Sequence, residues 1–385
     1  MRNHTSRSLK IGFVYDDSLD SDDGVAQYVK RLGGWLENQG HEVSYLVGET
    51  KITSWGKGRV YSLAQNLTVR WGGNRLSIPI ASRAKDITKA LSAGNFDVLH
   101  VQFPFSPFMA QRVINRANGQ TAVVGTIHVP SVSSLSNFGS KLLRLIYGRS
   151  LRRFNRFISV SKVAQDYAKK NFNLESEILP NTVDIKRFRS PKPKRAKNKK
   201  IVFLGRLTAR KGCLYLIKAF SQLAAGREDL ELIIAGDGPH RQRLEDYVRR
   251  LRLSDKVNFL GHVPEDQKPK LLSSADIAVF PSLYGESFGI VLIEAMAAGA
   301  GVVIGGNNPG YASVLGEQPK LLVNPKDTAE FASRLAHFLD NPSETSKAHS
   351  WQQLAVEQYD INIVGKKLAV IYESAIAKAN KSRHN

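Results

Sequence analysis

Short apolar runs alternate along the chain with longer segments in which apolar residues recur every three or four positions. The first series comprises an apolar run at 10–15, an amphipathic segment at 24–40 and a second apolar run at 41–47. Continuous apolar runs predict buried strands, and the longer periodicity predicts helices. Buried strands that alternate with helices form a parallel sheet covered on both faces, so the sequence predicts an α/β fold. Further strands are expected at 96–102, 122–128 and 156–161.

The alternation is interrupted at 186–200, KRFRSPKPKRAKNKK, where two prolines stand in a dense basic run typical of an exposed linker. It resumes with the strand-like runs KIVFLGRL at 200–207, LELIIAGDG at 230–238, KVNFLGHV at 256–263, ADIAVFPS at 275–282 and GVVIGG at 301–306. An amphipathic helix at 360–379 follows near the end. We therefore expect two Rossmann-like domains. The expected division is a first domain at 1–190, a linker at 191–200, a second domain at 201–355 and a C-terminal helix at 356–385 that packs back on the first domain.

The length of the chain agrees with two domains, because 385 residues exceed what one core usually holds. Ligands of open α/β sheets bind beyond the carboxyl ends of the strands. We therefore expect the two domains to face each other across a cleft lined by these loops.

Cys213 is the only cysteine, so no internal disulfide can form, which fits a reducing compartment. The basic N-terminus leads into the first predicted strand and lacks the apolar region of a signal peptide. No run approaches the ~18 apolar residues of a membrane span. These features predict a cytoplasmic protein, or one bound to the cytoplasmic face of a membrane.

The charge balance is strongly positive, with 55 Lys and Arg against 34 Asp and Glu and a net charge of +21. Such a surface favours an anionic partner, which could be nucleic acid, anionic lipid or a phosphorylated substrate. Solubility alone is the other explanation.

The stretch YGESFGIVLIEAMAAG at 284–299 holds two carboxylates, Glu286 and Glu294, around an apolar run. A helix is expected to begin near 287–289 and to end near Gly299. The first amides of a helix have no intrahelical partners and attract an anion. A carboxylate buried inside an apolar helix is costly without partners, so Glu294 is expected to bind a polar ligand such as ribose hydroxyls, or to pair with a distant basic residue.

The stretch FLGRLTARKG at 203–212 predicts a strand, a loop and the start of a helix. Its loop carries Arg206, Arg210 and Lys211, which suit a diphosphate because Arg can bind it in a bidentate manner and Lys acts as a point charge. An exposed basic turn would have the same composition. A second glycine turn, AGDGP at 235–239, would also allow a ligand to approach the backbone closely.

Two features of the first half could also contact a ligand. His128 ends a predicted strand and could donate a hydrogen bond to a substrate hydroxyl or phosphate, although a lone histidine is more often structural. The acidic stretch at 16–29 contains Asp20 and Asp22, a pattern that also occurs at metal sites. We favour ordinary helix capping there, with Gly24 opening the helix that follows.

Together and in this order, these motifs resemble the family-4 retaining glycosyltransferases of GT-B fold over nearly the whole chain. Residues 284–299 resemble the E-x7-E motif of that family, and GRLTARKG resembles its diphosphate-binding loop. Within the family, the pattern is most similar to the bacterial phosphatidylinositol α-mannosyltransferases, on the stretches NFDVLHVQFPFSP, TIHVPS, RFISVS, ILPNTVDIKRF and FLGHV.

The resemblance implies transfer of a hexose with retention of configuration and without a metal or another cofactor. It favours mannose from GDP-mannose over a sugar from a UDP-sugar. Arg206 and Lys211 would bind the diphosphate, Glu294 the ribose and Glu286 the sugar. The implied catalytic residues are His128, Glu286, Arg206 and Lys211, and the implied donor-binding residues are Gly24, Arg206, Lys211, Val263, Lys268, Ser287, Phe288, Gly289, Ile290 and Glu294.

The positive charge is then explained by a lipid or lipid-linked acceptor. Residues 141–170 and the helix at 82–94 are basic and partly amphipathic, as in segments that lie on anionic membranes. Packing and solvation alone would also account for them. The expected membrane contacts are Lys85, Lys89, Arg149, Arg152 and Arg153.

The acceptor side departs from the phosphatidylinositol mannosyltransferase pattern. Asp23 stands where a second glycine is expected, Ala26 stands where glutamine is expected, and no lysine occurs in VPSVS after the histidine. These departures leave an inositol acceptor in doubt. The alternatives are a UDP-sugar-dependent transferase acting on a glycolipid or a soluble saccharide and, more remotely, a nucleic-acid-binding protein. A dinucleotide-dependent oxidoreductase ranks below both, because GRLTARKG lacks the G-x-G-x-x-G spacing.

Overall fold

The structure is a computed structural model that describes residues 7–20, 23–71, 74–128, 144–189 and 198–381. The chain forms two compact units, one comprising Met1–Asn181 with Ile361–Asn385 and the other Thr182–Asp360. Residues after 181 join the second unit because Val183 pairs with Asp360 in a parallel bridge, and Thr182 Oγ1 donates to the carbonyl of Tyr359 at 3.0 Å. The boundaries thus differ from the expected 190 and 356, and most of the expected linker lies outside the described residues.

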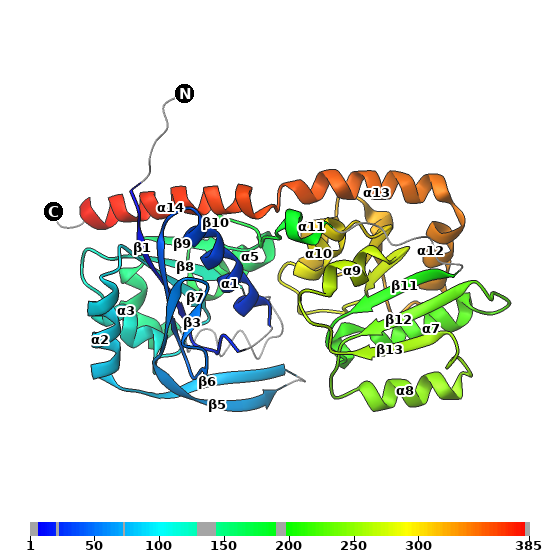
Figure 1. Cartoon of the computed structure of the whole chain (residues 1–385), viewed down its shortest axis with the longest axis horizontal. Helices are drawn as coiled ribbons and strands as arrows, with labels where there is room; N and C mark the ends of the chain where they lie inside the picture. The colour runs from blue at the N-terminus through cyan, green and yellow to red at the C-terminus, as the bar shows by residue number, and fades with distance from the viewer. Residues whose placement is uncertain (1–6, 21–22, 72–73, 129–143, 190–197, 382–385) are drawn as a thin grey trace, which may run out of the picture. The chain divides into compact units, whose positions relative to one another are not determined.

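The first unit is built on an eight-stranded sheet in the order β10-β9-β8-β7-β1-β2-β4-β3 (Figure 1). All neighbouring strands are parallel except the short pair β3 and β4. The strands expected from the apolar runs are all present in it. Their bounds are β1 Lys10–Tyr15, β2 Glu42–Val47, β3 Ser54–Trp55, β4 Gly58–Ser62, β7 Val98–Phe103, β8 Ala122–Ile127, β9 Arg156–Ser159 and β10 Glu177–Ile178.

Helices α1 (Gly24–Asn38) and α14 (Ile361–Lys381) pack on each other, with α1 against β2 and α14 against β8, so the C-terminal helix belongs to the first unit (Figure 1). The core there includes Trp35, Tyr45 and Tyr372, all buried. A two-stranded hairpin, β5 (Ala64–Trp71) and β6 (Asn74–Ser82), forms a sheet of its own that the sequence did not predict. Further helices described in this unit are α2 Ala84–Gly94, α3 Ala110–Arg116, the 3-10 helix η1 Gly148–Arg153 and α5 Lys162–Phe172, and residues 144–147 are also helical.

The second unit contains a six-stranded parallel sheet in the order β13-β12-β11-β14-β15-β16. Its first five strands were expected, whereas the two-residue strand β16 was not. Its strands are β11 Lys199–Leu204, β12 Leu230–Ala235, β13 Val257–Gly261, β14 Ile277–Phe280, β15 Val302–Gly306 and β16 Leu322–Val323. Its helices are α6 Ile185–Phe188, η2 Ala209–Lys211, α7 Cys213–Leu223, α8 Arg241–Arg250, α9 Lys268–Ser273, α10 Ile290–Ala298, α11 Pro309–Leu315, η3 Pro319–Leu321, α12 Thr328–Asp340 and α13 Pro342–Glu357.

The parallel sheets place the predicted ligand loops where such folds bind ligands. The loop at 205–212 follows β11, the segment at 281–289 follows β14, and His128 follows β8. All three therefore lie beyond the carboxyl ends of strands. Within the described parts of the chain, no helix is both long and apolar enough to cross a membrane.

Candidate active site

A cluster of three charged side chains forms in the second unit beyond β11 and β14. Arg210 Nη1 donates to Glu286 Oε1 at 2.7 Å, and Lys211 Nζ donates to the same oxygen at 2.9 Å. The side chains are only 16%, 18% and 13% exposed for Arg210, Lys211 and Glu286, so the charges interact in a partly desolvated environment. Burial alone would raise the pKa of Glu286, but the two cations outweigh it and hold this pKa below its ordinary value.

Arg210 also fixes the backbone that leads to Glu286. Its Nη1 donates to the carbonyls of Tyr284 at 3.1 Å and Gly285 at 3.0 Å. The sequence places Arg210 in the basic loop, but the resemblance carried a role only to Arg206 and Lys211. The role of Arg210 was missed because only the structure shows that Arg210 and Lys211 both contact the carboxylate of Glu286. The cluster keeps one net positive charge, from two cations and one carboxylate, and still favours an anion.

Gly212 shapes the loop that carries these cations. It adopts a φ of 73° as the N-cap of α7, a conformation that glycine accepts without strain. A Cβ added there would lie 1.9 Å from the carbonyl oxygen of Pro281. The close contact brings the loop after β11 against the segment after β14, which places Arg210 and Lys211 beside Glu286.

Arg206 stands at the start of the same loop and is exposed. The glycines of the neighbouring turn at 236–238 also have a structural role next to this loop. A Cβ at Gly236 would lie 2.0 Å from the carbonyl oxygen of Gly205, and a Cβ at Gly238 would lie 2.6 Å from that of Leu207. The close backbone approach that these glycines permit is therefore to the loop that carries Arg206.

Helix α10 begins at Ile290 and is capped by Gly299 at a φ of 80°, as the sequence predicts. It packs against α6, α9 and α13, which explains an apolar sequence on all its sides. Gly289, at a φ of 106°, is the N-cap, and a Cβ there would lie 2.6 Å from the ring of Tyr311. Glu294 lies about one turn into this helix and is 4% exposed.

The other predicted donor residues of this unit lie around the same strand ends. Ser287 is half-buried between Glu286 and α10. Phe288 is buried, and its ring centroid lies 5.4 Å from that of Tyr359. Val263 is buried after β13, and Lys268, the first residue of α9, pairs with Glu265. These assignments stay predictions.

In the first unit, Asp23 caps α1. Its Oδ1 accepts hydrogen bonds from the amides of Val25 at 2.8 Å and Ala26 at 3.0 Å, and its Oδ2 accepts one from Tyr15. A phosphate at the exposed Gly24 would therefore lie beside the carboxylate of Asp23, which already accepts hydrogen bonds from two amides in the first turn of α1. The capping interpretation of the acidic stretch is correct for Asp23.

The metal interpretation has no support in the described residues. Asp20 accepts hydrogen bonds from Ser18, from Thr50 and from the amide of Lys51, while Asp22 lies outside the described residues. No group of three His, Cys, Asp or Glu side chains that could hold a metal occurs in the described ranges.

His128 follows β8 and is partly buried. Its Nε2 lies 2.8 Å from Oε1 of Gln102, a residue of β7 that the sequence did not single out. The ring of Tyr28 meets it edge-on with centroids 4.9 Å apart. Burial lowers the pKa of His128 to about 4, although the carboxylate of Asp23 opposes this shift, so the imidazole is neutral at pH 7.

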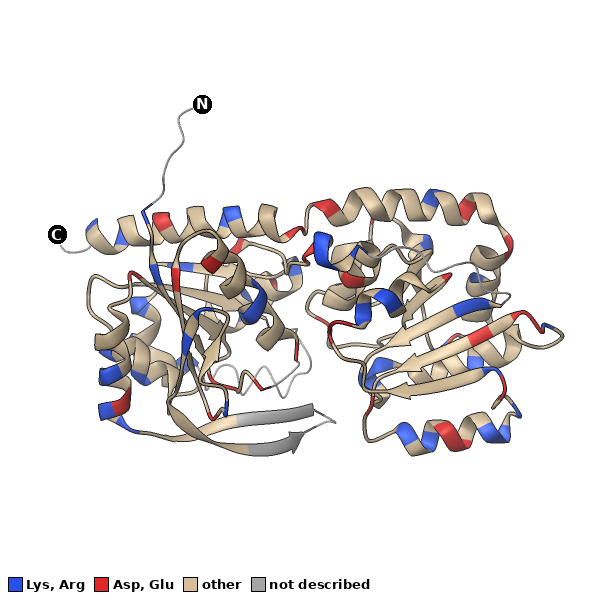
Figure 2. Ribbon diagram, viewed as in Figure 1, with Lys and Arg blue, Asp and Glu red and all other residues tan. Residues whose placement is uncertain are grey.

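The predicted membrane residues lie on helices of the first unit. Lys85 and Lys89 are exposed on α2, whose ribbon carries both basic and acidic residues in Figure 2. Arg149 and Arg152 are exposed on η1. Arg153 differs, because its Nη2 donates to the carbonyls at the end of α3, at 3.0 Å for Ala117 and 3.1 Å for Asn118. Arg153 therefore holds η1 against α3.

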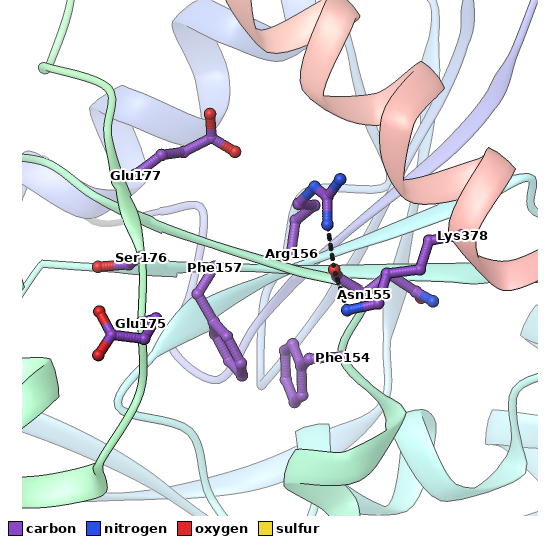
Figure 3. A pocket seen from close by; sticks show the side chains of 8 residues that line it. All are labelled: Phe154, Asn155, Arg156, Phe157, Glu175, Ser176, Glu177 and Lys378. Atoms are coloured by element: carbon purple, nitrogen blue, oxygen red, sulfur yellow. Dashed lines mark hydrogen bonds between the residues drawn. The ribbon is translucent and has the colours of Figure 1, made fainter. Parts of the chain in front are cut away.

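A shallow pocket of about 410 Å³ lies elsewhere on this unit, at the amino ends of β9 and β10 (Figure 3). Its cations are used internally, since Arg156 donates to Ser374 Oγ at 2.6 Å and Lys378 to the carbonyl of Asn155 at 3.3 Å. Ligands of parallel sheets bind at the opposite ends of the strands. This pocket is therefore not the candidate active site.

Known proteins resemble both halves of the chain. Residues 23–187 match the family model described as Glycosyltransferase Family 4, and residues 184–357 match the model described as Glycosyl transferases group 1. The phosphatidyl-myo-inositol mannosyltransferase of Mycolicibacterium smegmatis is 30% identical over 381 residues, which cover 95% of this chain and 94% of that protein.

Solved structures match over the same length. A glycosyltransferase from Rickettsia africae aligns with a TM-score of 0.77 at 16% identity, covering 96% of this chain and 99% of that one. The Anabaena protein Alr3699/HepE, in complex with UDP and glucose, gives 0.72 at 19% identity, covering 95% and 100%. These likenesses show the GT-B fold. With 30% identity over nearly the full length of a family member, the chain belongs to the family-4 glycosyltransferases, retaining enzymes that use nucleotide-sugar donors.

Proposed function

We propose that the enzyme transfers mannose from GDP-mannose to a lipid or lipid-linked acceptor at the cytoplasmic surface of a membrane. The observation that carries the donor half is the cluster of Arg210, Lys211 and Glu286 beyond the strand ends of the second unit. The mannosyl donor is supported by relatives named phosphatidyl-myo-inositol mannosyltransferase, which align over nearly the whole chain.

The chemistry of this cluster suits the departure of a nucleoside diphosphate. Negative charge grows on the diphosphate as the bond to the sugar breaks, and fixed cations at that place stabilise the transition state. Lys211 of the cluster and Arg206 of the same loop would supply these charges together with Arg210, so the transfer would need no metal. The carboxylate of Glu286 is ionised at neutral pH and can accept hydrogen bonds from sugar hydroxyls.

A thermal-shift panel of nucleotides tests the donor. GDP-mannose and GDP should raise the melting temperature more than UDP-glucose, UDP-GlcNAc and UDP do, because a ligand that binds only the folded state stabilises it. Since an Anabaena protein of the same fold binds UDP, stronger stabilisation by UDP-sugars would replace GDP-mannose with a UDP-sugar. No shift with any nucleotide sugar would contradict the proposal.

The Arg210→Met variant tests the cluster itself. Removing the guanidinium frees the segment around Gly285 and takes away one net positive charge, so the affinity for GDP should fall by about tenfold or more. The matched control is Arg243→Met on α8, an exposed arginine outside the cluster, which should bind GDP as the wild type does. Equal affinity in the Arg210 variant would show that the cluster does not bind the diphosphate.

The lipid half of the proposal is supported by apolar side chains exposed near the basic helices. Phe108, just before α3, is 51% exposed, and Leu145, just before η1, is 78% exposed. Helix α3 packs against both α2 and η1, so these side chains and the exposed lysines belong to one region of the first unit. Exposed apolar groups among cations suit an anionic membrane interface. Leu67, Ile78 and Ile80 of the β5–β6 hairpin are also exposed.

Liposome flotation tests this region. The protein should float with vesicles that contain anionic lipid at low salt, and Lys85→Gln/Lys89→Gln should float less, because each cation near the surface contributes about 1 kcal/mol. The control Lys366→Gln/Lys367→Gln removes the same charge from exposed positions on α14. Binding to DNA instead of to vesicles would favour the nucleic-acid alternative, and binding to neither would leave the enzyme with a soluble acceptor.

A further inference from the structure

A column of buried polar side chains lies on one face of the sheet of the first unit. Gln102 of β7 pairs with Thr126 of β8. His100 lies two residues before Gln102, and His128 lies two residues after Thr126, so all four side chains are on the same face of the sheet. His100, Gln102 and Thr126 are at most 3% exposed. The column ends at His128, beyond the carboxyl end of β8, where the strand ends face the ligand side.

The side-chain amide of Gln102 has only one chemically acceptable orientation. Its Nε2 lies 3.2 Å from the backbone carbonyl oxygen of His100, and a carbonyl oxygen can only accept a hydrogen bond. The amide NH₂ must therefore face this carbonyl, since the opposite orientation would place two oxygens against each other. Oε1 then faces His128.

This orientation fixes the tautomer of His128. Oε1 of Gln102 can only accept, so the Nε2 atom that lies 2.8 Å away must carry a hydrogen. A neutral imidazole has one N–H, and burial keeps this imidazole neutral at pH 7. Nδ1 therefore carries the lone pair, and it meets no hydrogen-bond partner among the described residues.

His100 offers an internal contrast. Its Nδ1 lies 2.7 Å from the hydroxyl of Tyr372, and its Nε2 lies 2.6 Å from the hydroxyl of Thr126. Hydroxyls donate as well as accept, so these partners allow either tautomer of His100. A single tautomer is thus imposed on His128 by Gln102 and is not a general property of histidines in this core.

We propose that Gln102 is a positioning residue that holds His128 in its Nε2–H tautomer, so that Nδ1 accepts a hydrogen bond from a substrate hydroxyl. The group that contacts His128 is then an alcohol of the transferred sugar or of the acceptor, and not a phosphate oxygen, whose lone pairs would oppose that of Nδ1. The sequence left both partners open. The inference rests on the proposed function for the identity of the alcohol.

The tautomer can be measured without any substrate. In protein labelled with ¹⁵N-histidine, two-bond proton–nitrogen spectra distinguish a protonated nitrogen from an unprotonated one, and His128→Gln identifies the signals of His128. Wild type should show only the Nε2–H form, and Gln102→Met should show a mixture. Gln165→Met is the matched control, because Gln165 also donates to a backbone carbonyl, that of Ser176, and does not contact His128. An Nδ1–H form or a mixture in the wild type would overturn the inference.

The hydroxyl partner is tested with GDP-mannose analogues in which one sugar hydroxyl at a time is replaced by fluorine, and with acceptors altered in the same way. Fluorine cannot donate a hydrogen bond, so one analogue should lose about tenfold in kcat/KM with the wild type and much less with Gln102→Met. GDP affinity should stay equal in wild type and Gln102→Met, and a fall would mean that His128 serves the phosphates. If no sugar nucleotide binds the wild type, the proposed function fails while the tautomer measurement still decides the role of Gln102.

Discussion

One carboxylate oxygen of Glu286 accepts hydrogen bonds from two cationic side chains, those of Arg210 and Lys211. This shared contact fixes the charge and the geometry of the cluster. Without the carboxylate, Arg210 and Lys211 would lie close together with little solvent to separate their charges. With it, both are oriented and the cluster keeps one net charge for a ligand. The same residue is thus expected to act in stability and in sugar binding.

The Glu286→Gln variant should be less stable than the wild type by about 3 kcal/mol at pH 7, since it leaves partly buried cations without their counter-ion. The folded state lowers the pKa of Glu286, so its stabilising contribution is present above the ordinary carboxyl pKa and is lost as pH falls below it. Urea unfolding at pH 7 and at pH 4 should show the difference shrinking.

Asp246→Asn is the control for this comparison, because its pair with Arg249 is 45% and 62% exposed. Exposed pairs contribute at most about 1 kcal/mol. A Glu286 variant as stable as this control at pH 7 would contradict the structural role of the cluster.

His128 should leave a signature in the pH dependence of stability. Its folded pKa is about 4, below the ordinary 6.5, so the unfolded chain takes up a proton first as pH falls. The free energy of unfolding should therefore decrease as pH falls from 6.5 to about 4. The His128→Gln variant should lack the part of this decrease that His128 causes, which is up to about 1.4 kcal/mol per pH unit. His100, whose pKa burial lowers to about 3, contributes in the same direction, and Asp16, whose pKa burial raises to about 7, contributes in the opposite one.

The contributions of His100 and Asp16 cancel in the difference between the unfolding free energies of wild type and His128→Gln. Denaturant unfolding of the two proteins should give curves that converge as pH falls from 6.5 towards 4. Parallel curves would show that His128 binds protons equally in the folded and unfolded chains, which would contradict the lowered pKa of His128 in the folded protein.

At the scale of elements, buried strands could be predicted from the sequence because each is a continuous apolar run, such as those at 10–15 and 301–306. The hairpin β5–β6 was missed because it does not pair with the main sheet and has no such run. The glycine turn at 235–239 predicts a close approach to the backbone, but the sequence does not show that the approaching group includes the loop at 205–207. Gln102 was missed because its partners, His100 and His128, come together only through strand pairing.

The loop after β11 permits a controlled test of what its glycine does. Gly212 and Gly226 have nearly the same φ, 73° and 72°, but a Cβ at Gly212 would meet the carbonyl of Pro281, whereas Gly226 has nothing within 4 Å. Alanine at either site incurs the backbone strain of about 1–3 kcal/mol. Gly212→Ala should cost clearly more and should weaken GDP binding, because it separates the cation loop from Glu286.

Denaturant unfolding and GDP titration of both alanine variants measure these effects. Gly226→Ala is expected to bind GDP like the wild type. Two variants with equal losses of stability and equal GDP affinities would mean that the contact with Pro281 does not position the cations.

For the whole molecule, the excess charge and the apolar side chains have to be explained together. The net charge of +21 alone fits several anionic partners. In a glycosyltransferase, the positive charge does not require a nucleic-acid partner. The exposed Phe108 and Leu145 beside basic helices favour an anionic membrane, which has an apolar interior. Charge supplies long-range attraction, and the apolar groups supply the part of binding that salt does not screen.

This division predicts how activity depends on salt. With acceptor lipid in anionic vesicles, the transfer rate should fall as ionic strength rises, because the Debye length shrinks from about 10 Å at 0.1 M to about 3 Å at 1 M. In neutral vesicles the rate should start lower and change little. Lys85→Gln/Lys89→Gln should behave in anionic vesicles as wild type does at higher salt, while Lys366→Gln/Lys367→Gln should not. Product formation measured by mass spectrometry across the salt series decides between the outcomes, and a rate that falls equally in both kinds of vesicle would locate the salt effect at the diphosphate cluster instead of at the membrane.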